Sequence, residues 1–326
     1  MRKGEHINIT PENLGQCFVE RSFEAIYEKC SKDFKALVTI EQFIEIAYSF
    51  NQGVESYQLS TTTSLGSLTQ YVWLDNCKER AICVAFDTTN VIQSLLLKPY
   101  IVFPESDQRY TKNKYIMPVK EEWFIFWGGT NEFINYHYAY TSQRYAYDLV
   151  IMKDGQSYKD TTIRNENYYA FNKEVVAPAD GQVIKVIDNV ADNIPGEMNE
   201  SQPAGNYVVI EHQNNEYSML AHFKQHSIQV KVGDSVKQGQ VVGLCGNSGN
   251  SSEAHIHFQV MNSEDYVNGQ SIRIRFEDGT EPIQGDTVSY MRPRNNKIVE
   301  KIDRVDTALT LGDLFFAIPR FVGSFF

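Results

Sequence analysis

The segment His255-Ile-His-Phe-Gln-Val260 alternates polar and apolar side chains, which is the pattern of a β-strand with one face in a core. Residues two apart on a strand point to the same side, so His255 and His257 share one face. Ile256, Phe258 and Val260 share the other face, which can pack into the core. The strand would hold two imidazoles on a rigid support, an arrangement suited to a metal ion or to proton transfer. Two surface histidines on a half-exposed strand would give the same pattern.

Size and composition are those of an ordinary globular protein. The chain has 326 residues, from which we expect about two domains. Apolar residues make up 42% of it, enough to build a core without disulfides. The formal net charge of -11, with no basic block, argues against nucleic-acid binding. The five cysteines form no Cys-x-x-Cys pair, so we expect neither a disulfide framework nor a zinc–thiolate site.

Neither end of the chain predicts a membrane anchor. Residues 1–10 lack the apolar segment that a signal peptide needs. No run of about 18 apolar residues is present, so we expect no transmembrane helix. Residues 314–326 are apolar but broken by Pro319, and we expect a final strand or a packed tail there.

The sequence predicts an α+β domain over residues 1–108. Apolar residues recur at helical spacing across 12–50, and Thr39 with Gln42 predicts the capped start of a helix. From about residue 56 the pattern changes to that of strands, expected at 68–73, 80–86 and 91–97. Helices followed by a strand meander are typical of an α+β domain. Turn-forming residues are frequent over 109–130, which we expect to be a connector.

The remainder, 131–326, is expected to form a mainly antiparallel β domain, either a sandwich or a half-barrel. Short apolar runs alternate there with glycine and asparagine turns. The expected strands are 145–152, 174–177, 181–188, 206–212, 216–223, 228–230, 241–246, 255–261 and, in an extension beyond the core of the domain, 271–276.

Three further polar residues stand out in this domain. Asp148 lies inside an apolar strand, where an acidic residue is rare unless it is paired or binds a metal. It could equally pair with Arg144 or cap a turn. His222 lies on another expected strand, where a buried histidine bonded to a backbone carbonyl is the alternative. His137 is a candidate ligand only in combination with these other residues, because a lone histidine is more often an ordinary polar residue.

Seven segments occur in a fixed order along the domain. They are Asp148, Ala177-Pro-Ala-Asp-Gly-Gln-Val183, Asn206-Tyr-Val-Val-Ile210, Leu220-Ala-His222, the glycine hairpin 233–239, Gly246-Asn-Ser-Gly249 and His255-Ile-His257. This ordered set resembles the lysostaphin/LytM-type zinc metallopeptidases, which cut peptidoglycan cross-links, over about residues 131–285.

The resemblance implies one zinc ion held by His137, Asp148 and His257. His222 and His255 would then flank the metal-bound water as catalytic residues, and either of them could be the base. One departure concerns the first ligand, because ten residues separate His137 from Asp148 where the family has three. A longer loop costs little extra closure entropy. His212 and His226 are the alternatives, although both lie outside the expected positions.

The function implied is that of a zinc-dependent endopeptidase that hydrolyses peptide cross-links of bacterial peptidoglycan through a metal-activated water. The alternative is a catalytically inactive LytM-like domain that binds or regulates cell-wall hydrolases. Such enzymes act outside the cell or in the cell wall, although no signal peptide is visible in this chain. The helices and meander of residues 1–108 resemble, more loosely, the nuclear-transport-factor-2-like domains. The sequence identifies neither the bond cut nor the oligomeric state.

Overall fold

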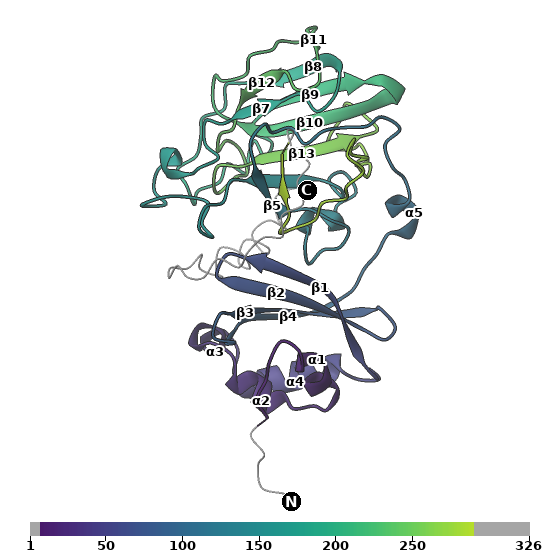
Figure 1. Ribbon diagram of the computed structural model, residues 1–326, viewed down its shortest axis with the longest axis vertical. Coiled ribbons are helices and arrows are strands. Elements are labelled where there is room, and N and C mark those ends of the chain that lie inside the picture. The colour runs from purple at the N-terminus through teal and green to yellow at the C-terminus, as the bar shows by residue number, and fades with distance from the viewer. Residues whose placement is uncertain (1–6, 290–326) are drawn as a thin grey trace, which may run out of the picture. The chain divides into compact units, whose positions relative to one another are not determined.

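The computed structural model describes residues 7–289, which fall into two compact units divided between Ile101 and Val102 (Figure 1). Each unit is described by itself. No helix among these residues combines the length and the apolar character needed to cross a bilayer.

The first unit is an α+β domain, as the sequence predicts. Thr39 and Gln42 form the predicted capping box at the start of the longest helix. The strands pair antiparallel in chain order, so the sheet is a simple meander. A strand at 57–65, which the sequence analysis left out, forms one edge of it. The elements are α1 (Leu14–Val19), α2 (Phe23–Glu28), α3 (Lys32–Leu37), α4 (Ile40–Phe50), β1 (Tyr57–Leu65), β2 (Leu68–Asp75), β3 (Arg80–Asp87) and β4 (Ile92–Pro99).

The helices of this unit cover one face of its sheet. Phe18 and Ile26 from the helices are fully buried in one cluster with Ile82 and Phe86 of β3. This unit therefore has a core of its own, as a separate domain requires.

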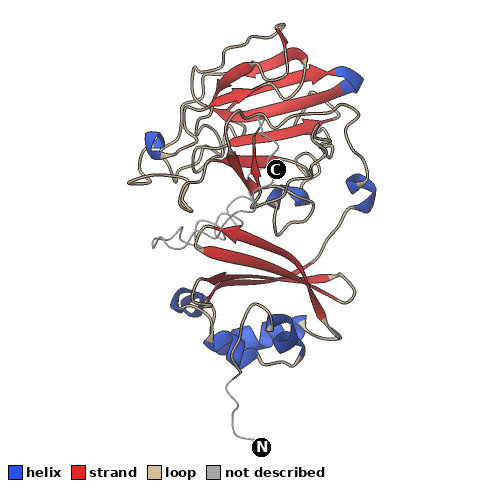
Figure 2. Ribbon diagram, in the orientation of Figure 1, coloured by secondary structure: helices blue, strands red, loops and turns tan. Residues whose placement is uncertain are grey.

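The second unit is built on an eight-stranded antiparallel sheet with the order β11-β8-β9-β10-β13-β6-β5-β14 (Figures 1 and 2). A two-stranded sheet, β12-β7, contributes Val175 and Val242 to the same core cluster. The mainly antiparallel architecture expected from the sequence is thus confirmed. The elements are α5 (Pro104–Asp107), β5 (Trp123–Trp127), the 3-10 turn η1 (Tyr136–Ala139), β6 (Tyr147–Val150), η2 (Asn165–Asn167), β7 (Glu174–Val176), β8 (Gly181–Ile187), β9 (Asn206–His212), η3 (Gln213–Asn215), β10 (Glu216–Phe223), β11 (Ser235–Val236), β12 (Val241–Leu244), β13 (Ile256–Met261) and β14 (Thr287–Val288).

Strand β13 lies near the middle of the large sheet, between β10 and β6. Its apolar residues Ile256, Phe258 and Val260 have no solvent exposure and belong to the main core, as predicted. The opposite face is covered as well, since His257 is only 7% exposed. His257 therefore lies in a covered site and not in open solvent, while His255, just before the first residue of β13, is half-buried.

Residues 109–130 differ from the predicted connector. Trp123–Trp127 forms β5, which pairs with β6, and both Tyr115 and Trp123 are fully buried. The apolar run 123–127 joins the sheet in spite of the turn residues around it. Two predicted strands, 228–230 and 271–276, are absent from the described chain. The second contributes only single bridges, such as that between Tyr115 and Phe276. The predicted tail at 314–326 lies outside the described residues.

Candidate metal centre

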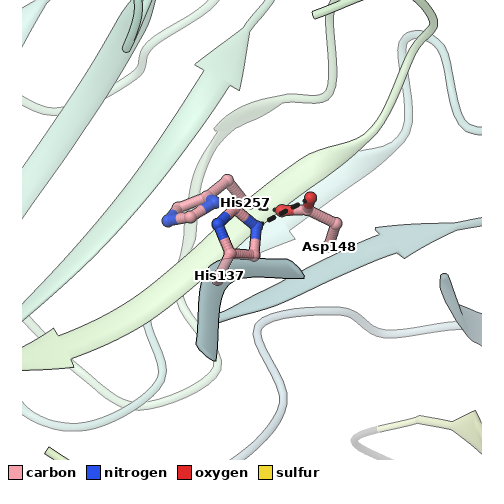
Figure 3. A group of neighbouring side chains, drawn as sticks. All are labelled: His137, Asp148 and His257. Carbon is pink, nitrogen blue, oxygen red and sulfur yellow. Dashed lines mark hydrogen bonds and ion pairs between the residues drawn. The ribbon is translucent and has the colours of Figure 1, made fainter. Parts of the chain in front are cut away.

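Asp148 and His257 are brought together by strand pairing. Asp148 lies on β6, all four residues of which are buried, and it pairs directly with His257 of β13. Side chains of a directly opposed antiparallel pair point to the same face. The Nδ1 atom of His257 accordingly lies 2.9 Å from Oδ1 of Asp148 (Figure 3).

His137 reaches the same carboxylate from a 3-10 turn. Asn135 shapes this turn, because its side-chain oxygen accepts a hydrogen bond from the His137 backbone and its amide nitrogen donates to the carbonyls of Gly129, Arg144 and Ala146. The His137 side chain is 1% exposed, and its Nε2 lies 2.9 Å from Oδ2 of Asp148 (Figure 3).

One ligating atom from each of His137, Asp148 and His257 lies within 4.8 Å of the other two. Within residues 7–289 this is the one cluster of at least three potential metal ligands. Two nitrogens and one carboxylate oxygen form a donor set typical of zinc, whose ligands at about 2.0–2.1 Å lie about 3.3 Å from one another in a tetrahedron. Three protein ligands leave the fourth position for water, so the residues present fit a catalytic zinc ion.

The two alternative first ligands are not part of this cluster. In His212, Nδ1 lies 2.8 Å from the Asp180 carbonyl and Nε2 lies 2.8 Å from Oγ of Ser218. His226 is exposed. Of the three histidines considered for this role, the structure brings His137 to the carboxylate.

The two flanking histidines lie close to the cluster. Nε2 of His255 is 4.0 Å from Oδ1 of Asp148, and the His222 and His255 rings are 4.6 Å apart. In His255, Nδ1 lies 2.9 Å from the Glu253 carbonyl; in His222, it lies 2.8 Å from the Ser248 carbonyl. A carbonyl oxygen can only accept, so each Nδ1 donates and each Nε2 is left as an acceptor in the neutral ring.

Backbone geometry holds His222 in place. Its φ of 69° lies in the left-handed region, which a residue with a side chain adopts only when its surroundings enforce it. Its carbonyl accepts a hydrogen bond from Gly246, where a Cβ would lie 2.2 Å from the Lys224 nitrogen. Only glycine allows this close approach at position 246.

Charge and burial set the protonation states of the site. Burial by itself raises the pKa of Asp148, but the charge of His137 and the hydrogen bonds of His137 and His257 outweigh it and hold that pKa well below its usual range. Burial lowers the pKa of His137 and, more strongly, that of His222. An ionised carboxylate beside neutral imidazoles is the state that binds a metal ion.

Two glutamines behind the imidazoles were missed by the sequence analysis. Oε1 of Gln143 lies 2.7 Å from Nδ1 of His137, and Oε1 of Gln259 lies 2.8 Å from Nε2 of His257. The sequence could have identified Gln259, since it lies two residues after His257 and so on the same face of the strand. It could not have identified Gln143, which lies in a loop.

Residues 166–269 match the model of peptidase family M23. The chain contains a peptidase family M23 domain. The matched range includes His222, His255 and His257 and begins after Asp148, so it covers neither His137 nor Asp148.

Relatives of this domain include an uncharacterized metalloprotease of Buchnera aphidicola, 36% identical over 72 residues that make up 22% of this chain and 19% of that protein. The peptidoglycan DD-endopeptidase ShyA of Vibrio cholerae is 40% identical over 65 residues, which make up 20% of this chain and 15% of that protein. The matches thus span less than a fifth of either relative. Among solved structures, the catalytic domain of lysostaphin from Staphylococcus simulans aligns at 25% identity over 36% of this chain and 85% of that chain, with a TM-score of 0.24.

Proposed function

We propose that this chain is a zinc-dependent endopeptidase that hydrolyses peptide cross-links of bacterial peptidoglycan. The observation that carries the proposal is the convergence of one buried carboxylate and two imidazole nitrogens, with two further histidines beside them. The M23 domain supports peptide hydrolysis, and the name of the Vibrio cholerae relative supports peptidoglycan as the substrate.

In this proposal Nε2 of His137, the carboxylate of Asp148 and Nδ1 of His257 hold the ion. A zinc ion in such a site lowers the pKa of water from about 15.7 toward about 7 and polarises a carbonyl group. The low pKa of Asp148 keeps the carboxylate ionised and able to bind the ion throughout the neutral range.

His222 and His255 are the residues proposed to act on the attacking water and its proton. Each has its Nδ1 held by a backbone carbonyl and presents Nε2 as an acceptor. One of them takes the proton from the attacking water, and the protonated ring can pass it to the leaving amine. The other, with its Nε2 as an acceptor, can take a hydrogen bond from the water and orient it for attack. Because the carbonyl partners fix both rings, little reorganisation is needed during the reaction.

In this proposal the peptide reaches the ligands over a small hollow beside them. Met219, Ala221 and Tyr266 form apolar and aromatic walls, and Asn250 adds an amide. A surface of this kind suits an extended peptide, whose side chains meet apolar walls while its backbone needs a few polar partners.

Digestion of purified peptidoglycan, with mass analysis of the released fragments, tests the proposal together with the metal content of each protein. We expect the wild type to carry one zinc ion and to release peptide fragments. His257→Ala should do neither, while His226→Ala, which changes an exposed histidine, should match the wild type.

Two outcomes would contradict the proposal. A zinc-loaded wild type that releases nothing would favour a regulatory role for the domain. Equal release by the wild type and His257→Ala would remove His257 from the site.

A further inference from the structure

The loop between His137 and Asp148 supports the outer side of both imidazoles, of His137 directly and of His257 through Gln259. Gln143 meets His137 directly, and the carbonyl of Ser142 meets Gln259, which in turn meets His257. This loop is also the part of the chain in which the spacing between the histidine and the aspartate departs from that of the lysostaphin/LytM-type enzymes.

On the His257 side the geometry fixes every donor and acceptor. The Ser142 carbonyl can only accept, so the atom of Gln259 that lies 3.1 Å from it must be the amide nitrogen. The amide oxygen of Gln259 therefore faces Nε2 of His257 at 2.8 Å, and Nε2 must donate. With its proton held on the outer nitrogen, His257 turns Nδ1 toward Asp148.

The His137 side repeats this arrangement with the nitrogens exchanged. Oε1 of Gln143 lies 2.7 Å from Nδ1, so Nδ1 donates outward and Nε2 faces Asp148. Which ring nitrogen binds a metal is set by the hydrogen bond of the other one.

The loop is itself held in place by several contacts, so it can hold the two histidines. Asn135 bonds to the carbonyls of Arg144 and Ala146, and the backbone nitrogen of Ser271 donates to the Thr141 carbonyl at 3.0 Å. The guanidinium of Arg144 bonds to the Tyr138 carbonyl and stacks over the Phe103 ring at 3.4 Å. These contacts hold both ends of the loop and its middle.

We infer that Gln143 and Gln259 are positioning residues, and that the loop 138–147 uses them to fix both histidines with one chosen nitrogen toward the metal. This inference rests on the proposed metal site and goes beyond it, because it assigns a purpose to the long spacing between His137 and Asp148.

Matched substitutions distinguish a positioning role of the two glutamines from a packing role. Gln259→Met keeps the size of the side chain and removes the acceptor, whereas Gln259→Glu keeps an acceptor for His257 and removes the donor to Ser142. The same pair of changes at Gln143 tests the His137 side. Gln182→Met, on an exposed position of β8, controls for the chemistry of the substitution.

Zinc dissociation constants of the full chain, measured by competition with a chromophoric chelator, give the first readout. We expect both methionine variants to bind zinc about 10–100-fold more weakly than the wild type, as removal of such outer contacts does in other zinc sites. The glutamate variants should stay closer to the wild type than their methionine counterparts, and Gln182→Met should be unchanged. If the methionine variants bind as the wild type does, or better than the glutamate variants, the side chains only pack and the inference is wrong.

The second readout does not depend on activity. In zinc-loaded protein labelled with 15N-histidine, at about pH 8, the ion occupies the inner nitrogens, and the wild type should show slowly exchanging protons on Nε2 of His257 and Nδ1 of His137. Gln259→Met should lose the first of these signals and keep the second. Absence of both signals in the wild type would overturn the inference even if zinc binds, while failure of the wild type to bind zinc would contradict the proposed function.

Discussion

Asp148 has a strand on one side and a loop on the other, and the two sides deliver their imidazoles differently. His257 arrives through the register of β13 against β6, so backbone pairing places its side chain beside Asp148, and Gln259 then holds the ring. His137 arrives on a 3-10 turn, whose position depends on the amide of Asn135. A periodic sequence pattern determines the strand that carries His257, whereas individual hydrogen bonds determine the turn that carries His137. Different substitutions should therefore displace the two ligands.

The largest effect is expected where the two sides meet. Asp148→Asn removes the negative charge that both imidazoles share, while a similar shape remains. We expect zinc to be lost and fragment release from peptidoglycan to fall by about 10³-fold or more, since catalysis needs the ion. Asp180→Asn, which changes an exposed carboxylate bonded to Lys237, is the control and should be as active as the wild type. Retention of zinc by Asp148→Asn would show that the imidazoles bind it without the carboxylate.

The loop side can be disturbed without touching a ligand. Asn135→Ala removes four hydrogen bonds from a fully buried side chain and leaves buried carbonyl groups without their donor. We expect a loss of about 1–3 kcal/mol in the free energy of unfolding of the metal-free protein. Zinc affinity should fall about tenfold or more, because the turn that carries His137 loosens. Denaturant titration and chelator competition measure the two quantities.

Asn206→Ala is the matched control for that change. Asn206 is equally buried and bonds to the Val190 and Phe223 carbonyls, away from the three ligands. It should show a similar loss of stability with unchanged zinc affinity. If both variants lose zinc to the same degree, the turn at His137 has no special part in holding the ligand.

Acid should lower the stability of the metal-free protein through two buried histidines of the site, His137 and His222. Burial lowers the pKa values of His137 and His222 below the unfolded value of about 6.5. Below that pH the unfolded chain takes up protons that the folded chain does not, so stability is present above about pH 6.5 and is lost as the pH falls. The slope reaches up to about 1.4 kcal/mol per pH unit for each such histidine. Denaturant midpoints between pH 7.5 and 5 measure it, and His222→Asn should flatten the slope while His226→Ala leaves it unchanged.

The same contrast explains how far the sequence alone could lead. Alternation along 255–260 predicts which residues of β13 enter the core, because side chains of a strand alternate by geometry. The loop side carries no such period. Nothing in the spacing places Gln143 behind His137, and the turn residues of 109–130 conceal the strand β5. Individual hydrogen bonds within the loop and pairing between strands decide these features, and neither leaves a periodic pattern in the sequence.

The smallest effect is expected at the flanking histidines, where one ring has a second partner. Nδ1 of His255 lies 2.9 Å from the Glu253 carbonyl and 3.0 Å from Oγ of Ser251, whereas the partner of Nδ1 in His222 is the Ser248 carbonyl. Ser251→Ala removes only the longer of the two contacts of His255 Nδ1, because the Glu253 carbonyl still accepts its proton. A hydrogen bond of this kind contributes about 0.5–1.5 kcal/mol, so kcat should fall less than about tenfold, with zinc affinity unchanged. Rates of fragment release, measured beside zinc affinity, check this. A loss as large as that in Asp148→Asn would mean that the hydroxyl of Ser251, and not the backbone, orients His255 for the reaction.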